Sequence, residues 1–281
     1  MPSPSEAAPS LALDRGLAIV ELLASEPGGM SLLGVAERLR IPRSATHRLL
    51  TGLADHGFVL QDRERGFYFL STKLLSLAFS HMAGAGIVDA AQPVLDRLAQ
   101  ETGELARLSV VEEDRLTWVA RAQGARSGLR YDPEMGQRAQ LSCSASGFAW
   151  LSSKTDKEAL AIVARQGFGK REEFGPKAPE TPQALLPHLR RARELGYSVA
   201  VATYYDWMAA IAAPVPHPVH GEVIGTVSIA GPVSRLPEKR LHEFGPLLLA
   251  AAADLSAVML GSPALAHHAG AGRPRSLRKV S

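Results

Sequence analysis

The segment from Ser31 to His56, SLLGVAERLRIPRSATHRLLTGLADH, contains two short helical patterns separated by a tight turn. Ser31 predicts the start of the first helix, because its hydroxyl can accept a free backbone N–H of the first turn. Pro42 disfavours a helical backbone at Ile41, yet suits the start of a second helix running from about Arg43 to His56. The pattern predicts either a helix-turn-helix or an ordinary helical hairpin with a solvated face.

The second predicted helix has two different faces. At roughly 100° per residue, its apolar side holds Ala45, Leu49, Gly52 and Leu53. The opposite side holds hydrogen-bonding and cationic groups, as a helix lying in the DNA major groove requires. The chain contains no asparagine, so base contacts would come from Arg, Ser, Thr and His. We expect DNA contacts from Arg43, Ser44, Thr46, His47, Arg48 and Thr51.

A predicted β-hairpin follows the second helix directly. Gly57 is typical of a helix C-terminus. The β-prone runs Phe58–Leu60 and Phe67–Leu70 flank the polar loop Gln61–Gly66, which suits a hairpin. A hairpin in this position is a wing, and this order favours the helix-turn-helix over the helical hairpin. At its tip, we expect Arg63 and Arg65 to reach phosphates or the minor groove.

Composition limits the class of protein. A chain of 281 residues favours two domains, and a net charge of +3 does not by itself indicate a DNA-binding protein. The single Cys143 excludes an internal disulfide and fits a reducing cytoplasm, where we expect the protein to act. No apolar run approaches the roughly 20 residues that span a bilayer, so we expect no membrane partner.

The domain organisation is predicted from shifts in residue pattern. We expect a disordered leader over 1–10, a winged helix-turn-helix domain over 11–71, a linker helix and hinge over 72–86, a second domain over 87–262 and a basic disordered tail over 263–281. The hinge is placed at Gly84–Gly86. The second domain mixes helices with strands. We expect an amphipathic helix over Ile87–Thr102, strands that include Leu105–Glu112 and Ser127–Tyr131, a helix that starts at Thr181 or Pro182 and reaches Leu195, and a final long helix from Pro237 to about Leu260. One antiparallel sheet with helices is an α+β fold.

Enzymatic chemistry has little support in the sequence. Cys143 lies between two serines but lacks the glycine pattern of a nucleophile elbow, so an enzyme acting through Cys143 is a remote alternative. His217 and His220 lie in a turn without the cysteine or carboxylate partners of a metal site. The glycines at Gly84 and Gly86 do not complete a dinucleotide motif. We therefore expect no catalytic residues, no metal and no cofactor.

The chain resembles transcriptional regulators of the IclR family. The resemblance rests on Leu13–Val59, on TGE at Thr102–Glu104, on GYSVA at Gly196–Ala200, and on IAAPV and SIAGP at Ile211–Val215 and Ser228–Pro232. It implies a winged helix-turn-helix joined by a helix to a GAF-like effector-binding domain with a mixed, mostly antiparallel sheet. It also implies dimers, often dimers of dimers, that bind promoters of catabolic operons and respond to small metabolites.

The resemblance also places an effector pocket between the sheet and its flanking loops. Backbone amides at the start of the helix near Gly147 would suit a carboxylate. This chain has Trp207 and Ala210 where the family commonly has smaller or polar residues, and Tyr204 and Tyr205 lie beside Trp207. These departures predict a small effector that is largely apolar or aromatic. The expected pocket residues are Leu141, Ser142, Cys143, Gly147, Trp207, Ala210, Ser228 and Ala230.

Together these features predict a ligand-responsive, sequence-specific DNA-binding regulator. Its expected partners are double-stranded DNA with a palindromic operator, a small-molecule effector and a second copy of itself. The alternative is a DNA-binding regulator whose C-terminal domain only oligomerises. A ligand that stabilises the native protein would separate the two, because binding to the native state must raise its stability.

Overall fold

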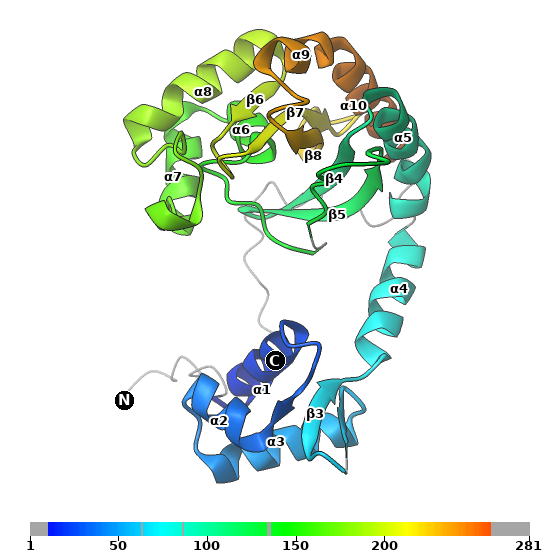
Figure 1. The fold of residues 1–281 in the computed structure, drawn as a ribbon, viewed down its shortest axis with the longest axis vertical. Helices are drawn as coiled ribbons and strands as arrows, with labels where there is room; N and C mark the ends of the chain where they lie inside the picture. Colours follow the sequence, from blue (N-terminus) through cyan, green and yellow to red (C-terminus); the bar gives the residue numbers. More distant parts are fainter. Residues whose placement is uncertain (1–10, 63, 86, 134–135, 260–281) are drawn as a thin grey trace, which may run out of the picture. The chain divides into compact units, whose positions relative to one another are not determined.

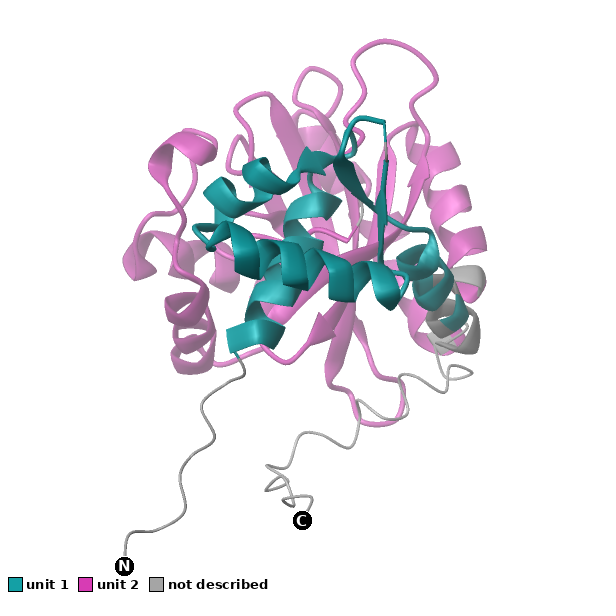
Figure 2. Cartoon of the chain, turned by 90° about the horizontal axis from the view of Figure 1, so that it is seen from below, with its two compact units in different colours: residues 1–81 teal, residues 82–281 magenta. Residues whose placement is uncertain are grey.

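The structure is a computed structural model that describes residues 11–62, 64–85, 87–133 and 136–259. The predicted leader, the predicted tail, Arg63 and Gly86 lie outside the described residues. The chain divides into two compact units between His81 and Met82, inside helix α4 (Lys73–Ala85), as Figure 2 shows by colour. None of the described helices combines the length and apolarity needed to cross a bilayer.

The N-terminal unit is a small helical domain with a three-stranded sheet (Figure 1). Its helices are α1 (Leu11–Ala24), α2 (Leu32–Leu39) and α3 (Arg43–Asp55). Its strands are β1 (Met30–Ser31), β2 (Val59–Gln61) and β3 (Phe67–Leu70), in the antiparallel order β1-β3-β2. The core between them consists of Ile19, Leu23, Val35, Leu50, Val59 and Tyr68. This arrangement confirms the winged helix-turn-helix.

Local signals set the ends of the two central helices. The Oγ of Ser31 accepts a hydrogen bond from the Gly34 N–H at 3.1 Å, which caps α2 as predicted. Arg40 ends α2 in the left-handed region, with φ of 55°. Gly57 follows α3 with φ of 74°, a backbone conformation that glycine adopts without strain. The turn between the end of α2 at Leu39 and the start of α3 at Arg43 contains three residues, 40–42.

The linker differs from the prediction. α4 continues through Gly84 to Ala85, so the predicted hinge is wrong for these two residues. The next helix, α5 (Ile87–Thr102), has the predicted bounds. A helical backbone is accessible to glycine at only a modest free-energy cost relative to alanine, so a single glycine does not end a helix.

The C-terminal unit is built on a five-stranded antiparallel sheet in the order β5-β4-β8-β7-β6. The strands are β4 (Leu105–Glu112), β5 (Arg115–Gln123), β6 (Ser198–Val201), β7 (Met208–Pro216) and β8 (Val223–Pro232). One face packs against α5, α9 (Glu238–Glu243) and α10 (Gly245–Met259). The other face packs against α6 (Ala145–Ser152), α7 (Asp156–Gln166) and α8 (Pro182–Leu195), as in Figure 1. A short 3-10 helix, η1 (Arg171–Glu173), lies in the loop before α8. The α+β fold class is confirmed.

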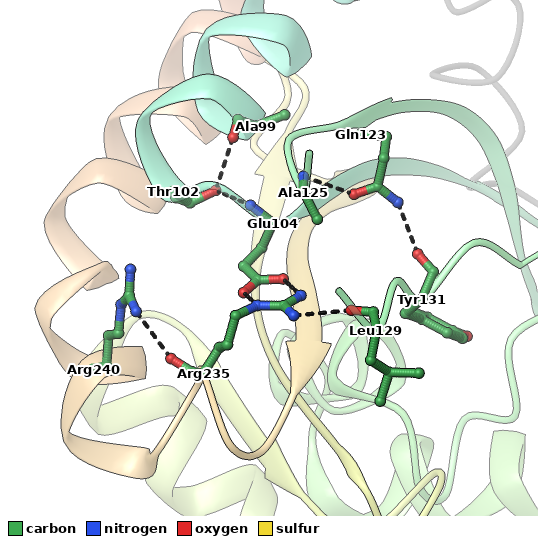
Figure 3. A network of polar contacts seen from close by, with 9 residues as sticks. All are labelled: Ala99, Thr102, Glu104, Gln123, Ala125, Leu129, Tyr131, Arg235 and Arg240. Atoms are coloured by element: carbon green, nitrogen blue, oxygen red, sulfur yellow. Dashed lines mark hydrogen bonds and ion pairs between the residues drawn. The ribbon is translucent and has the colours of Figure 1, made fainter. Parts of the chain in front are cut away.

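The segment Ser127–Tyr131 is not a strand, contrary to the prediction. Its carbonyls accept hydrogen bonds from side chains instead: Leu129 from Arg235 at 2.9 Å and Tyr131 from Gln123 at 3.0 Å (Figure 3). Arg235 is itself held by the buried carboxylate of Glu104 at 2.6 and 2.7 Å. This network fixes the segment that carries Tyr131 against the end of the sheet.

The predicted long helix from Pro237 is two helices, α9 and α10, with a break at Phe244. α10 begins at Gly245, so Pro246 lies in its first turn, where a backbone N–H has no partner within the helix and its absence costs little. A Cβ on Gly245 would lie 2.6 Å from the Tyr197 ring, so no larger residue fits at this position without a shift of the ring or the backbone. Both helices contribute side chains to the core on the same face of the sheet.

Candidate functional site

The outer face of α3 is the first candidate site. Arg43, Ser44, His47, Arg48 and Thr51 are all exposed, as predicted, while Leu50 is fully buried in the core. The face therefore presents two guanidinium groups, an imidazole and two hydroxyls within three helical turns. These are the groups that hydrogen-bond to base edges and phosphates.

Thr46 does not belong to that face, and its predicted DNA contact is wrong. Its side chain is fully buried, and its Oγ1 donates a hydrogen bond to the Pro42 carbonyl at 3.2 Å. Thr46 and Leu50 are four residues apart, so they lie on the same side of the helix and form its buried stripe. The hydroxyl of Thr46 instead stabilises the first turn of α3.

The tip of the β2–β3 hairpin is ordered by one aspartate. Asp62 Oδ1 accepts hydrogen bonds from the backbone N–H groups of Glu64, at 2.9 Å, and Arg65, at 3.3 Å. Arg65 is exposed at this tip, while Arg63 lies outside the described residues. The hairpin follows α3 in the position that a wing requires.

A small cavity in the C-terminal unit is the second candidate site. It lies between the α6 face of the sheet and the start of α6, and the space inside it that a water-sized sphere can occupy is about 10 Å³. The lining combines cationic, hydroxyl, aromatic and apolar side chains. They are Arg107, Trp118, Ser144, Ala145, Ser146, Tyr204, Met208, Ala210 and Ser228.

Arg107 is the charged group of this cavity. It lies on the central part of β4 and is 4% exposed. Its guanidinium carbon lies 4.0 Å from the centroid of the Trp118 ring and 5.2 Å from that of Tyr131. Burial lowers the pKa of Arg107, while a hydrogen bond with Tyr131 opposes this shift. An arginine remains protonated under such conditions, so the cavity holds a buried positive charge.

Several donors around Arg107 have no hydrogen-bond partner among the described residues. They include Nε and Nη1 of Arg107, Nε1 of Trp118 and Oγ of Ser228. Arg107 and Ser228 are directly opposite each other in the register of β4 and β8, so both side chains leave the same face of the sheet. Side-chain atoms without hydrogen-bond partners therefore surround the positively charged guanidinium of Arg107.

The start of α6 closes the cavity from the other side. Ser144 is the N-cap residue, and its Oγ accepts a hydrogen bond from the Gly147 N–H at 3.0 Å. Ser144, Ala145 and Ser146 line the cavity. A helix N-terminus carries a partial positive charge, so this element also favours an anion.

Two of the predicted pocket residues, Ala210 and Ser228, line this cavity. Ala230 is buried beside it, opposite Ala210 in the register of β7 and β8, without lining it. Trp207 does not line it either. Trp207 is 37% exposed and stacks on Tyr205, with ring centroids 5.7 Å apart. These two rings contact the edge of Tyr131 and so lie outside the cavity lining.

The predicted residues Leu141 to Cys143 and Gly147 position α6 rather than line the cavity. Ser142 accepts a hydrogen bond from Gln140, and the carbonyl of Cys143 accepts one from Thr203 at 2.6 Å. Burial raises the pKa of the Cys143 thiol to about 12, so the thiol is neutral and a poor nucleophile. Leu141 and Gly147 are in close contact, because a Cβ on Gly147 would lie 2.4 Å from the Leu141 carbonyl oxygen.

Arg107 and Trp118 line the cavity but were not predicted from the sequence, and Tyr204 was expected only as a neighbour of Trp207. One signal for Arg107 was present: it is the only charged residue within LARLSVV, a run otherwise typical of a buried strand. An arginine in such a run is rarely fully buried without a partner. The convergence of Trp118 and Tyr204 on it depends on strand register and loop packing, which have no local signal.

A winged helix-turn-helix followed by a domain with a buried polar cavity defines a DNA-binding regulator that senses a small molecule. The chain belongs to the IclR family: the model of the bacterial transcriptional regulator IclR C-terminal domain matches residues 79–257, and that of the IclR helix-turn-helix domain matches residues 12–63. Members of this family regulate transcription and are not enzymes, which excludes the remote alternative of catalysis by Cys143.

Individual relatives agree with this assignment. The HTH-type transcriptional repressor AllR of Escherichia coli K12 is 29% identical over 248 residues, covering 88% of this chain and 90% of AllR. An IclR transcriptional regulator of Alicyclobacillus acidocaldarius shares the fold with a TM-score of 0.74 and 22% identity, over 90% of this chain and all of the other. An IclR homolog from Microbacterium hydrocarbonoxydans, solved in complex with 4-hydroxybenzoate, has a TM-score of 0.72 and 21% identity, over 89% of this chain and all of the other.

Proposed function

We propose that this regulator controls a catabolic operon and that a small effector, bound in the cavity of the C-terminal unit, changes its affinity for DNA. The observation that carries the DNA-binding part is the exposed polar face of α3. Base edges would be contacted by Arg43, Ser44, His47, Arg48 and Thr51. Arg65, together with Arg63, would contact phosphates or the minor groove from the wing.

The proposed assembly is a homodimer, with dimers of dimers as the larger form, acting in the cytoplasm. A two-fold dimer presents two recognition helices to successive major grooves, one helical turn or a multiple apart. The proposed operator is therefore palindromic, with a half-site spacing set by the dimer.

The proposed effector is small and has an apolar or aromatic body. Trp118, Tyr204, Met208 and Ala210 supply the apolar and aromatic part of the cavity lining. The space inside the lining that a water-sized sphere can occupy is about 10 Å³, far below the roughly 300–1,000 Å³ typical of ligand pockets, so an effector would have to displace part of the lining to bind here. The fold relative that was solved with 4-hydroxybenzoate is in line with an aromatic effector. A C-terminal unit that only oligomerises would have no use for the unpartnered donors of this cavity.

Selection of bound duplexes from a random DNA pool by the purified protein tests the proposal. The expected result is a two-fold-symmetric motif whose affinity is lost in Arg48→Ala, while ligand-induced stabilisation of the C-terminal unit is unchanged. Arg190→Ala, an exposed arginine on α8, is the matched control and should bind the motif like the wild type. Binding without a motif that vanishes with added salt would contradict sequence-specific regulation, because only counterion release would remain.

A further inference from the structure

We propose that Lys73 and Ser71 are positioning residues for DNA recognition: they fix the first turn of α4 to the C-terminal end of α3, and so set the direction of α3 relative to α4. The proposal deepens the DNA-binding function proposed above and rests on it. Both residues act through α3, and neither needs to contact DNA.

The first argument is that the start of α4 is bonded to three consecutive residues at the end of α3. The Nζ of Lys73 donates a hydrogen bond to the His56 carbonyl at 2.6 Å and lies 4.7 Å from the centroid of the Phe58 ring. The Oγ of Ser71 donates to the Gly57 carbonyl, and the Ser71 N–H donates to the Phe58 carbonyl at 2.9 Å. The same Oγ accepts a hydrogen bond from the Lys73 N–H at 3.1 Å. We call these contacts the α3–α4 clamp.

The second argument is the charge at the end of α3. A helix C-terminus has carbonyls without partners inside the helix and carries a partial negative charge. The last turn of α3 contains no basic residue, and the helix ends with the acidic Asp55. The ammonium group of Lys73 therefore supplies, from another helix, the cation that this end of α3 lacks.

The third argument is that apolar packing does not fix α4 to the N-terminal unit. No described side chain of α4 is fully buried or belongs to the apolar core of that unit, and Leu75 and Leu77 are 58% and 50% exposed. A single polar contact in water contributes little free energy. Four contacts at one point nevertheless fix the direction of a helix. The clamp therefore determines the orientation of α3 more than the stability of the unit.

The orientation of α3 matters when two copies bind one operator. Two recognition helices must fit two half-sites at once, so their directions decide which half-site spacing fits. α4 continues without a break to Ala85, past the division between the two units. A tilt or rotation of α4 therefore reaches α3 through the clamp. On this basis Lys73 determines selectivity for half-site spacing, whereas the exposed face of α3 determines selectivity for base sequence.

Lys73→Met in the full-length protein tests the proposal, because methionine keeps a long apolar side chain without the amine. Binding is measured on the selected operator, on operators whose half-sites are one base pair closer or farther apart, and on a duplex with one half-site scrambled. The variant should bind the selected operator about 3- to 10-fold more weakly, lose its preference for that spacing, and bind the single half-site as the wild type does.

Two further variants and a control accompany this measurement. Lys73→Arg should restore the spacing preference, because a guanidinium also donates to a carbonyl and lies over an aromatic ring. Ser71→Ala should weaken the spacing preference in the same direction as Lys73→Met. Lys157→Met, at an exposed lysine on α7, is the matched control and should bind every duplex as the wild type does.

Salt dependence and urea unfolding separate the clamp from other roles of Lys73. A lysine that contacts a phosphate contributes about one to the slope of log affinity against log salt. A smaller slope, with equal weakening on every duplex, would make Lys73 a phosphate contact and overturn the proposal. So would a variant that loses stability but keeps the spacing preference, or one that binds every duplex unchanged. Failure of the wild type to select any two-fold-symmetric motif would instead overturn the proposed function.

Discussion

At the scale of single residues, burial separates the side chains of α3 that can meet DNA from one that cannot. Thr46 is fully buried and donates to the Pro42 carbonyl, whereas its neighbour His47 is exposed. The two residues differ by one position along a helix, which is a rotation of about 100°. The hydroxyl of Thr46 could hydrogen-bond to DNA by its chemistry, but its burial gives it a structural role within α3 instead.

Thr46→Val tests this role. The valine has nearly the same shape but lacks the hydroxyl, so the first turn of α3 loses one hydrogen bond. We expect the free energy of unfolding of the N-terminal unit to fall by about 1 kcal/mol. Urea unfolding would measure the loss, and operator affinity below the unfolding transition should remain that of the wild type. A large loss of affinity without a loss of stability would restore Thr46 as a DNA contact.

Cys143 gives a prediction about pH. Its thiol has a pKa of about 12 in the folded protein, whereas an unfolded chain has a thiol pKa near 8.5. Both states keep the proton below about pH 8, so the stability is fully present there. Above that pH the unfolded state loses the proton first, and stability falls by about 1.4 kcal/mol per pH unit until the folded thiol titrates.

The measurement compares the wild type with Cys143→Ala at about pH 8 and about pH 10. The wild type should lose more stability between these two pH values than the variant, which has no thiol to ionise. Equal losses would mean that the thiol of Cys143 is accessible to solvent in the folded state.

Some residue-level features could be predicted from the sequence because their signals are local. Ser31 and Gly57 act within four residues of their own position, and both have the predicted roles. Arg107 is different, because its role in the cavity depends on Trp118 and Ser228, which lie on other strands. The cavity lining follows from strand register, and no spacing within the sequence encodes that register.

At the scale of elements, the prediction succeeded where one signal set one boundary. α5 and β4 have the bounds that their patterns indicated, and α8 begins at the proline after the N-cap Thr181. The prediction was wrong where contacts between distant parts of the chain determine the local structure. Ser127–Tyr131 has the residues of a strand, but Arg235 and Gln123 use its carbonyls. The start of α10 passes close to the Tyr197 ring at Gly245, a contact between distant parts of the chain that has no local signal.

The placement of α6 gives a prediction at this scale. A Cβ on Gly147 would lie 2.4 and 2.5 Å from backbone atoms of Leu141, and backbone cannot move aside as a flexible side chain can. Gly147→Ala should therefore displace α6 and its N-terminus from the cavity. We expect a loss of about 1–3 kcal/mol in stability, together with weaker binding of the effector.

The matched control for Gly147→Ala is Gly16→Ala in α1, where a Cβ would meet nothing within 4 Å. This control should be as stable as the wild type or more stable by up to about 1 kcal/mol, since alanine favours a helix. Chemical unfolding measures both variants, and calorimetric titration measures the ligand. A Gly147→Ala protein with unchanged stability and ligand affinity would show that α6 does not depend on this close contact.

At the scale of the whole molecule, the chain divides into a unit with the candidate DNA-binding surface and a unit with the cavity. The order of the predicted domains followed from the sequence, because each unit has its own pattern. The division between the units falls inside α4, within the segment 72–86 that we expected to link the two domains. A continuous helix is a physical connection by which one unit can respond to the other.

If the effector changes operator affinity, the operator must change effector affinity by the same factor, because the coupling free energy between two sites is reciprocal. We therefore expect the selected operator to shift the dissociation constant of the effector by the factor by which the effector shifts that of the operator. Calorimetric titration of the effector into free and operator-bound protein measures one factor, and operator binding with and without the effector measures the other. Arg107→Gln should abolish both shifts together. A ligand that binds equally well with and without operator would leave the cavity as a ligand site without a regulatory role, because a ligand shifts an equilibrium only through a difference in affinity.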